Sequence, residues 1–206
     1  MLMSFREIIN SKGNVPINNE KIYGSNSEHS GPVLTFNKYA GTKDEAIQRF
    51  WRDIIGGCAS ARFHRPDNMY WGIGLSKDAR IQLKSMSKLI EKFDIYQCDP
   101  NNNLLNNQKE NEAYCIANIG QQYAVYFPNG GSTDLITWIY SEEVQLEWLN
   151  ISESNWLKPE IVKVEWDKRE IFWESDMSFT VQGRVPLQTP NLGSWIALIT
   201  HYSSNK

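Results

Sequence analysis

Residues 113–149 read AYCIANIGQQYAVYFPNGGSTDLITWIYSEEVQLEWL. This stretch consists of short segments rich in β-branched and aromatic residues, separated by turn sequences such as Asn118-Ile119-Gly120 and Pro128-Asn129-Gly130-Gly131. Short strands at this spacing are typical of an antiparallel β-sandwich. We therefore predict strands at residues 113–117, 122–127, 133–140, 144–149, 161–166, 179–182 and 195–201.

The part of the chain before this region predicts helices instead. Thr42 can cap a first helix, and Glu45 completes a capping box. Its apolar positions follow helical spacing, and Gly56-Gly57 end it; they are Ala46, Ile47, Phe50, Trp51, Ile54 and Ile55. A second helix begins at Ser76, and its expected buried stripe is Ala79, Leu83, Met86, Leu89, Ile90 and Phe93.

These patterns predict an α+β chain in which N-terminal helices pack on a C-terminal antiparallel β-sandwich. We place the helical segment at residues 1–93 and the sandwich at 94–206. The helices need an apolar partner, and the sandwich is the only large apolar surface available to them. One strand, starting near Val15, and two helices are too little to close a domain, so the first segment looks like the end of a larger unit.

Composition narrows the classes of function. The chain has 206 residues, 41% of them hydrophobic, which is enough for a real core. Its net charge of −3 gives no electrostatic footprint for nucleic acid or an anionic membrane surface. No apolar run approaches a membrane span, and the first residues do not form a signal peptide. The aromatic and Asn content is typical of extracellular carbohydrate-handling proteins, which favours a secreted or periplasmic parent protein.

Three cysteines, Cys58, Cys98 and Cys115, show no metal-binding spacing. Cys98 and Cys115 could be joined across a hairpin, or both could be free and buried. There is also no histidine pair or acidic pair at ligand spacing, so we predict neither a metal site nor a cofactor.

The densest cluster of chemically useful residues is GGCASARFHRP, residues 56–66. Its small residues permit close backbone approach, and Arg62, His64 and Arg65 offer donors suited to carboxylates, sugar hydroxyls or phosphates. One interpretation is a polar wall of a ligand cleft, which Tyr23 and Trp71 would share. The other is that the two arginines bind neighbouring carbonyls and hold two parts of the chain together.

Glu20 is the carboxylate best placed for catalysis, because it lies at the end of the first predicted strand, where a (β/α) barrel carries its chemistry. Glycoside hydrolysis needs two carboxylates, and no second one is recognisable. Glu20 could therefore also be an ordinary surface acid. The tryptophans of the β region, at positions 138, 148, 156, 166, 173 and 195, could be sugar platforms or core residues.

Several of these segments resemble a known family. PINNEKIYG (16–24), FWRDI (50–54) and GCASARFHRP (57–66) look like the end of a TIM barrel of bacterial glycoside-hydrolase-like proteins, from the cellulase and apiosidase superfamily. QYAVYFPNGG (122–131), EWL (147–149) and TPNLGSWIALI (189–199) look like the β-sandwich that follows such barrels, a domain labelled as collagen-binding.

The resemblance implies a non-catalytic C-terminal portion of a glycoside-hydrolase-like protein, with a carbohydrate or the missing catalytic barrel as its partner. Glu20 lies near the position of the family's nucleophile, and Lys21 is the other residue that could align there. Two alternatives remain open. The chain could be an autonomous module that binds glycan or collagen, or a glycoside hydrolase that uses Glu20.

Overall fold

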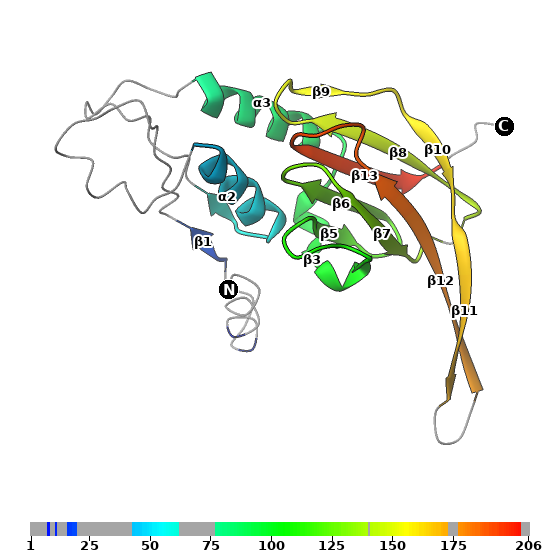
Figure 1. Ribbon diagram of the computed structural model, residues 1–206. Helices are drawn as coiled ribbons and strands as arrows, with labels where there is room; N and C mark the ends of the chain where they lie inside the picture. The colour runs from blue at the N-terminus through cyan, green and yellow to red at the C-terminus, as the bar shows by residue number, and fades with distance from the viewer. Residues whose placement is uncertain are drawn as a thin grey trace.

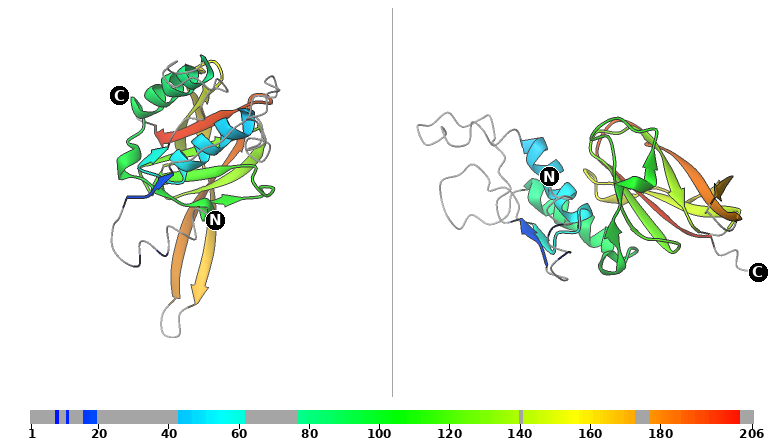
Figure 2. Two further views of the ribbon diagram at one scale, coloured as in Figure 1. Left: turned by 90° about the vertical axis from the view of Figure 1, so that its left-hand side faces the viewer. Right: turned by 90° about the horizontal axis from the view of Figure 1, so that it is seen from below.

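The structure is a computed structural model, and it describes residues 8, 11, 16–19, 43–61, 77–139, 141–172 and 177–202. Three layers make up most of this part of the chain (Figure 1). Helices α2 (Lys43–Ile55) and α3 (Lys77–Ile90) form the first layer. Figure 2 shows the helices on one side of the sheets and the β11–β12 hairpin on the other.

The second layer is a seven-stranded sheet. Its strands, in spatial order, are β10 (Glu160–Lys163), β8 (Glu143–Asn150), β13 (Trp195–His201), β6 (Gln122–Phe127), β5 (Tyr114–Asn118) and β3 (Asp99–Pro100), with β9 (Asn155–Trp156) beside β8. Every pairing in this sheet is antiparallel. Two 3₁₀ turns, η3 (Ile95–Gln97) and η4 (Asn102–Leu104), flank β3.

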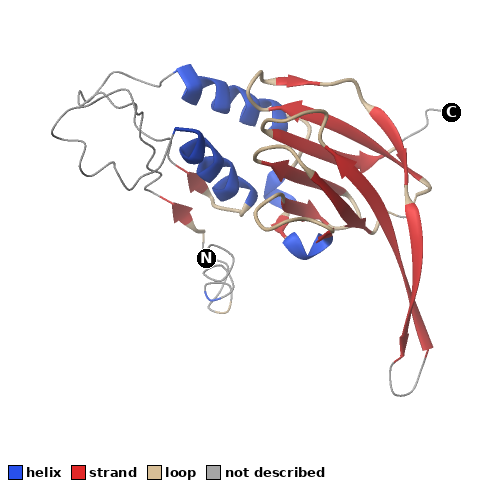
Figure 3. Cartoon of the chain, in the orientation of Figure 1, coloured by secondary structure: helices blue, strands red, loops and turns tan. Residues whose placement is uncertain are grey.

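The third layer is a four-stranded antiparallel sheet. Its order is β11 (Glu165–Phe172), β12 (Met177–Gln188), β7 (Ser132–Thr137) and β4 (Leu105–Asn106). The hairpin of β11 and β12 is longer than its neighbours and extends beyond the rest of the molecule (Figure 3). The predicted α+β class, with an antiparallel sandwich, is confirmed.

The seven-stranded sheet is buried on both faces, as its central strand β13 shows. Trp195, Ala197 and Ile199 face the core between the two sheets. Ile196 and Leu198 belong to a second core that faces the helices. Side chains alternate along a strand, so an uninterrupted apolar run is what a strand covered on both sides requires.

Helix α2 packs on this sheet as its apolar spacing predicts. Phe50, Trp51, Ile54 and Ile55 are buried in the second core, and the Trp51 ring lies 6.1 Å from the Tyr126 ring of β6. The helix ends in a Schellman motif. The Cys58 amide donates to the Asp53 carbonyl, the Gly57 amide donates to the Ile54 carbonyl, and Gly57 has a φ of 74°.

Helix α3 differs from the predicted stripe. Leu83 and Ile90 are 39% and 45% exposed, whereas Gln82 and Ser85 are buried. The reason is that both polar side chains have specific partners. Gln82 accepts a 2.6 Å hydrogen bond from the Trp51 indole, and the Ser85 hydroxyl donates to the Ile151 carbonyl at 2.7 Å. Periodicity alone cannot foresee such partners.

The strand predicted at 161–166 is in fact two strands in different sheets. Strand β10 ends at Lys163 and β11 begins at Glu165, so the chain passes from one sheet to the other at Val164. The segment 179–182 is part of the longer β12, which continues through Pro186. Strand β11 pairs with β12 only as far as Arg184, so beyond that residue β12 has no neighbour on the β11 side. Pro186, which has no backbone N–H, fits in β12 because no hydrogen bond is needed on that side.

The second core contains residues from both predicted segments, 1–93 and 94–206. The boundary between the segments, at residues 93 and 94, stays a prediction. Neither α2 nor α3 is long and apolar enough to cross a membrane.

All three cysteines are free and buried. Cys115 lies in the core between the sheets and Cys98 in the core facing the helices, so the sheet separates them and the possible Cys98–Cys115 bridge does not form.

Gly183 makes the crossing at Val164 possible. A Cβ at this position would lie 2.4 Å from Val164 Cγ1 and 3.0 Å from Thr137 Cγ2. We expect Gly183→Ala to lower the free energy of unfolding by about 1–3 kcal/mol through overpacking, measured by urea denaturation. In a Val164→Ala background, where the clashing methyl is gone, the same change should cost less. Purely additive costs of the two changes would contradict this packing.

Burial raises the pKa of the Cys98 thiol to about 11. In the unfolded chain the thiol ionises first, so folding stability should fall as the pH rises from about 9 to about 11. We expect Cys98→Ala to reduce the slope of stability against pH in this range, as measured by denaturation at a series of pH values. The slope should not vanish, because burial also raises the pKa of Tyr114. Identical slopes for the variant and the original chain would show that Cys98 does not contribute.

Candidate functional site

A small parallel sheet lies at the far side of the helices from the sandwich (Figure 1). Strand β1 (Asn18–Asn19) pairs in parallel with β2 (Ser60–Ala61), with Asn18 opposite Ser60 and Asn19 opposite Ala61. Helix α2 connects the two strands, and α3 follows β2. The order is therefore β–α–β–α, the repeating unit of a parallel barrel.

The predicted site residues follow the carboxyl ends of these two strands. Glu20 is the next residue after Asn19, and Arg62 is the next residue after Ala61. Because β1 and β2 are parallel and in register, the chain leaves both strands at the same edge of the sheet. In parallel barrels this edge carries the chemistry.

Six predicted site residues themselves lie outside the described residues, and their roles stay predictions. They are Glu20, Tyr23, Arg62, His64, Arg65 and Trp71. Within the described ranges, no three His, Cys, Asp or Glu side chains come together as metal ligands.

The described residues show how this β–α–β–α unit is held on the sandwich. From α2, Gln48 donates to the Asn129 side chain of the β6–β7 turn at 2.8 Å. Arg52 donates to Gln48 at 3.1 Å, and its guanidinium lies 5.4 Å from the centre of the Tyr114 ring. The sequence offers Arg62 and Arg65 as residues that hold two parts of the chain together; among the described residues, Arg52 connects α2 with the sandwich. The sequence does not reveal this role, because Tyr114 lies on β5, far from Arg52 along the chain.

Lys92 makes a second polar connection, just after α3. Its ammonium pairs with Glu147 of β8, whose side chain is only 7% exposed. Gln145 donates to the other carboxylate oxygen at 2.9 Å, and the Lys92 nitrogen lies 4.8 Å from the centre of the Trp156 ring. A buried carboxylate needs such partners, because it loses its hydration when the helix covers the sheet.

The tryptophans divide between core and surface. Trp148 and Trp195 are buried between the sheets, Trp138 and Trp156 are half-buried, and Trp166 is 37% exposed. Trp173 lies outside the described residues. For Trp148 and Trp195 the core interpretation is correct.

Comparison with solved structures finds similar folds. One structure described as a glycoside hydrolase matches 98% of this chain and 46% of its own, with a TM-score of 0.60 and 13% identity. A glycoside hydrolase family 5 structure from Bacteroides vulgatus ATCC 8482 matches 96% of this chain and 44% of its own, with a TM-score of 0.59 and 12% identity. This chain has the fold of part of a glycoside hydrolase. It spans less than half the length of these proteins.

The other comparisons add nothing further. No protein-family model matches the sequence, and no curated protein does. At 12–13% identity the solved structures show the fold, which agrees with the glycoside-hydrolase-like resemblance of the sequence. The collagen-binding label receives no support from them.

Removing the Lys92 charge tests the connection between the helices and the sheet. Lys92→Met leaves Glu147 without its ion partner, so we expect a loss of about 1–2 kcal/mol in the free energy of unfolding. The matched control is Lys84→Met, on the exposed face of α3, which should change stability by less than about 0.5 kcal/mol. Equal effects in urea denaturation would mean that the Lys92–Glu147 pair does not stabilise this interface.

Proposed function

We propose that this chain is the C-terminal portion of a glycoside-hydrolase-like protein. It supplies the last β–α units of a catalytic barrel together with an accessory sandwich, and it supports carbohydrate binding without hydrolysing glycosides alone. The observation that supports this most is the β1–α2–β2–α3 unit, whose strands are parallel and whose helices pack on the sandwich.

The small sheet itself argues for a partner. In the described part of the chain, β1 and β2 pair only with each other, over two residues each. A two-stranded sheet of this size is marginal in water, and parallel strands are normally found inside larger, covered sheets. Further barrel strands on both sides would complete it.

The proposal assigns a role to the predicted site residues. Glu20 follows β1 and Arg62 follows β2 at the edge where a barrel binds its substrate. Glu20 would contribute one carboxylate there, and Arg62, His64 and Arg65 would bind sugar hydroxyls or the substrate's leaving group. The second carboxylate that glycoside hydrolysis needs would come from another barrel strand. The parent protein would act outside the cytoplasm, on carbohydrate.

The test is to express the chain alone and joined to the coding sequence that adjoins it upstream, and to assay both on a panel of aryl glycosides. We expect no turnover from the chain alone and turnover from the joined protein. Glu20→Gln should abolish that turnover, whereas Glu153→Gln, at an exposed position of the sandwich, should not change it.

Two results would contradict the proposal. Adjoining sequence without β–α units would remove the barrel that the accessory role requires. Turnover by the chain alone that Glu20→Gln abolishes would show that it is a hydrolase in its own right.

A further inference from the structure

A groove lies on the outer face of the four-stranded sheet, the face turned away from the core. Its volume is about 560 Å³, within the range of small-molecule sites, and it crosses all four strands. The side chains and backbone that line it belong to Asn106, Asn107, Asp134, Ile136, Glu165, Trp166, Gln182 and Arg184. The seven-stranded sheet lies between α2 and α3 and the four-stranded sheet (Figure 2), so this groove is distinct from the edge of β1 and β2.

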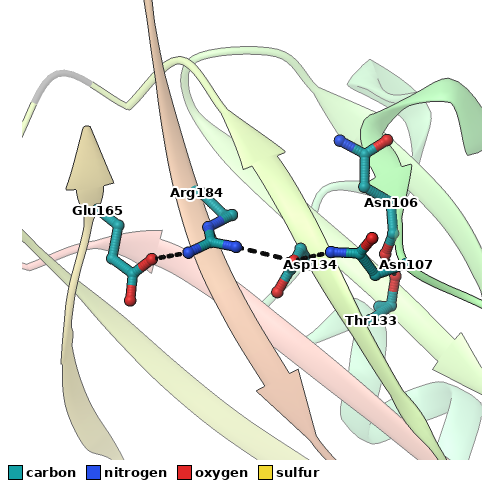
Figure 4. A network of polar contacts seen from close by, with 6 residues as sticks. All are labelled: Asn106, Asn107, Thr133, Asp134, Glu165 and Arg184. Atoms are coloured by element: carbon teal, nitrogen blue, oxygen red, sulfur yellow. Dashed lines mark hydrogen bonds and ion pairs between the residues drawn. The ribbon is translucent and has the colours of Figure 1, made fainter. Parts of the chain in front are cut away.

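Arg184 is the centre of the groove. Its guanidinium lies between two carboxylates, with one nitrogen bonded to Glu165 and another 3.2 Å from Asp134 (Figure 4). The three residues come from neighbouring strands, since Arg184 is opposite Glu165 on one side and opposite Ile136 on the other. A guanidinium held from both sides is fixed in place before any ligand arrives, which lowers the entropy cost of binding.

Asp134 is fixed by a second donor. The Asn107 amide donates to Oδ2, the same oxygen that receives the Arg184 bond, and the Asp134 side chain is 14% exposed. Asn107 has a φ of 58°, a left-handed conformation that asparagine tolerates better than most residues. Both of these donors therefore approach one oxygen of the carboxylate.

The other lining residues complete the chemistry of the groove. Ile136, directly opposite Arg184 in the strand register, lines the groove but is only 6% exposed, so the groups open to a ligand are polar. Asn106 and Gln182 also line the groove, and each side-chain amide can both donate and accept. Trp166 borders the groove, but side chains alternate along a strand, so it lies on the opposite face of β11 from Glu165.

We propose that this groove is a second carbohydrate site, which binds a neutral oligosaccharide through its ring hydroxyls. Each hydroxyl of a sugar can donate one hydrogen bond and accept others. A site that binds two neighbouring hydroxyls therefore needs an acceptor, such as a carboxylate, beside a donor that is held in place. The groove offers this arrangement on both sides of Arg184. Hydrogen bonds to charged groups are the stronger class of such contacts.

Charge argues against the other small ligands. Two carboxylates and one guanidinium leave the lining with a net charge of −1, which disfavours phosphates and acidic sugars. The groove has only two carboxylates, and in the described part of the chain no three His, Cys, Asp or Glu side chains come together, which is too few acidic ligands for a cation. The choice of a glycan among neutral polar ligands rests on the proposed function.

The experiment is isothermal titration of the full chain with cellohexaose, xylohexaose and mannohexaose, and with an oligogalacturonate as the acidic comparison. We expect at least one neutral oligosaccharide to bind, and Arg184→Met to weaken it by about tenfold or more. Glu165→Gln, at an exposed position that keeps its shape, should weaken it several-fold. Arg80→Met, an exposed arginine on α3, is the matched control and should have no effect.

Three results would overturn the inference. The first is that none of the neutral oligosaccharides binds, and the second is that the oligogalacturonate binds as well as they do. The third is binding that Arg184→Met and Glu165→Gln leave unchanged; if Arg184→Met does not fold, Glu165→Gln decides. The activity assay of the joined protein does not depend on this groove, so the proposed function can stand or fail separately.

Discussion

The rest of the structure depends on one constraint, which is that the seven-stranded sheet is apolar on both faces. Strands β6 and β13 place Val125 and Ala197 in the core between the sheets and Tyr126 and Ile196 in the core under the helices. Without α2 and α3, the second set would face water. At roughly 25 cal/mol for each Å² of apolar surface, that exposure would cost several kcal/mol, a large share of a domain's net stability. The helices are therefore part of the sandwich's own core as well as part of a β–α–β–α unit.

This double role gives the chain its functional layout. On one side, α2 packs against β2 of the parallel pair β1 and β2, from whose carboxyl ends Glu20 and Arg62 follow. On the other side, the four-stranded sheet presents the polar groove around Arg184. A barrel completed on the first side would leave the groove open. The accessory role and a separate sugar site are thus compatible in one molecule.

Local sequence patterns predicted the elements that depend on local physics. The β-branched and aromatic segments and the turns of residues 113–149, the apolar spacing of α2 and the glycine stop at Gly57 all correspond to observed elements. Long-range pairing could not be predicted in the same way. Gln82 is buried because Trp51 donates to it, and Arg184 meets Asp134 because β12 pairs with β7. The switch of sheets at Val164 depends on the space that Gly183 leaves. Glu20 was predicted as a candidate catalytic residue from its place after a strand, and the parallel pairing of β1 with β2 is what the structure adds to that prediction.

If the second core joins them, the helices and the sandwich fold as one unit, and native-state hydrogen exchange can detect this. We expect amides in the last turn of α2, at Ile54 and Ile55, to exchange through the same global opening as those of Ala197 and Leu198 in β13. Their opening free energies should agree to within about 1 kcal/mol and fall together with added urea. Exchange of the α2 amides through a separate opening of low free energy, while β13 stays protected, would show that the helices and the sandwich do not fold as one unit.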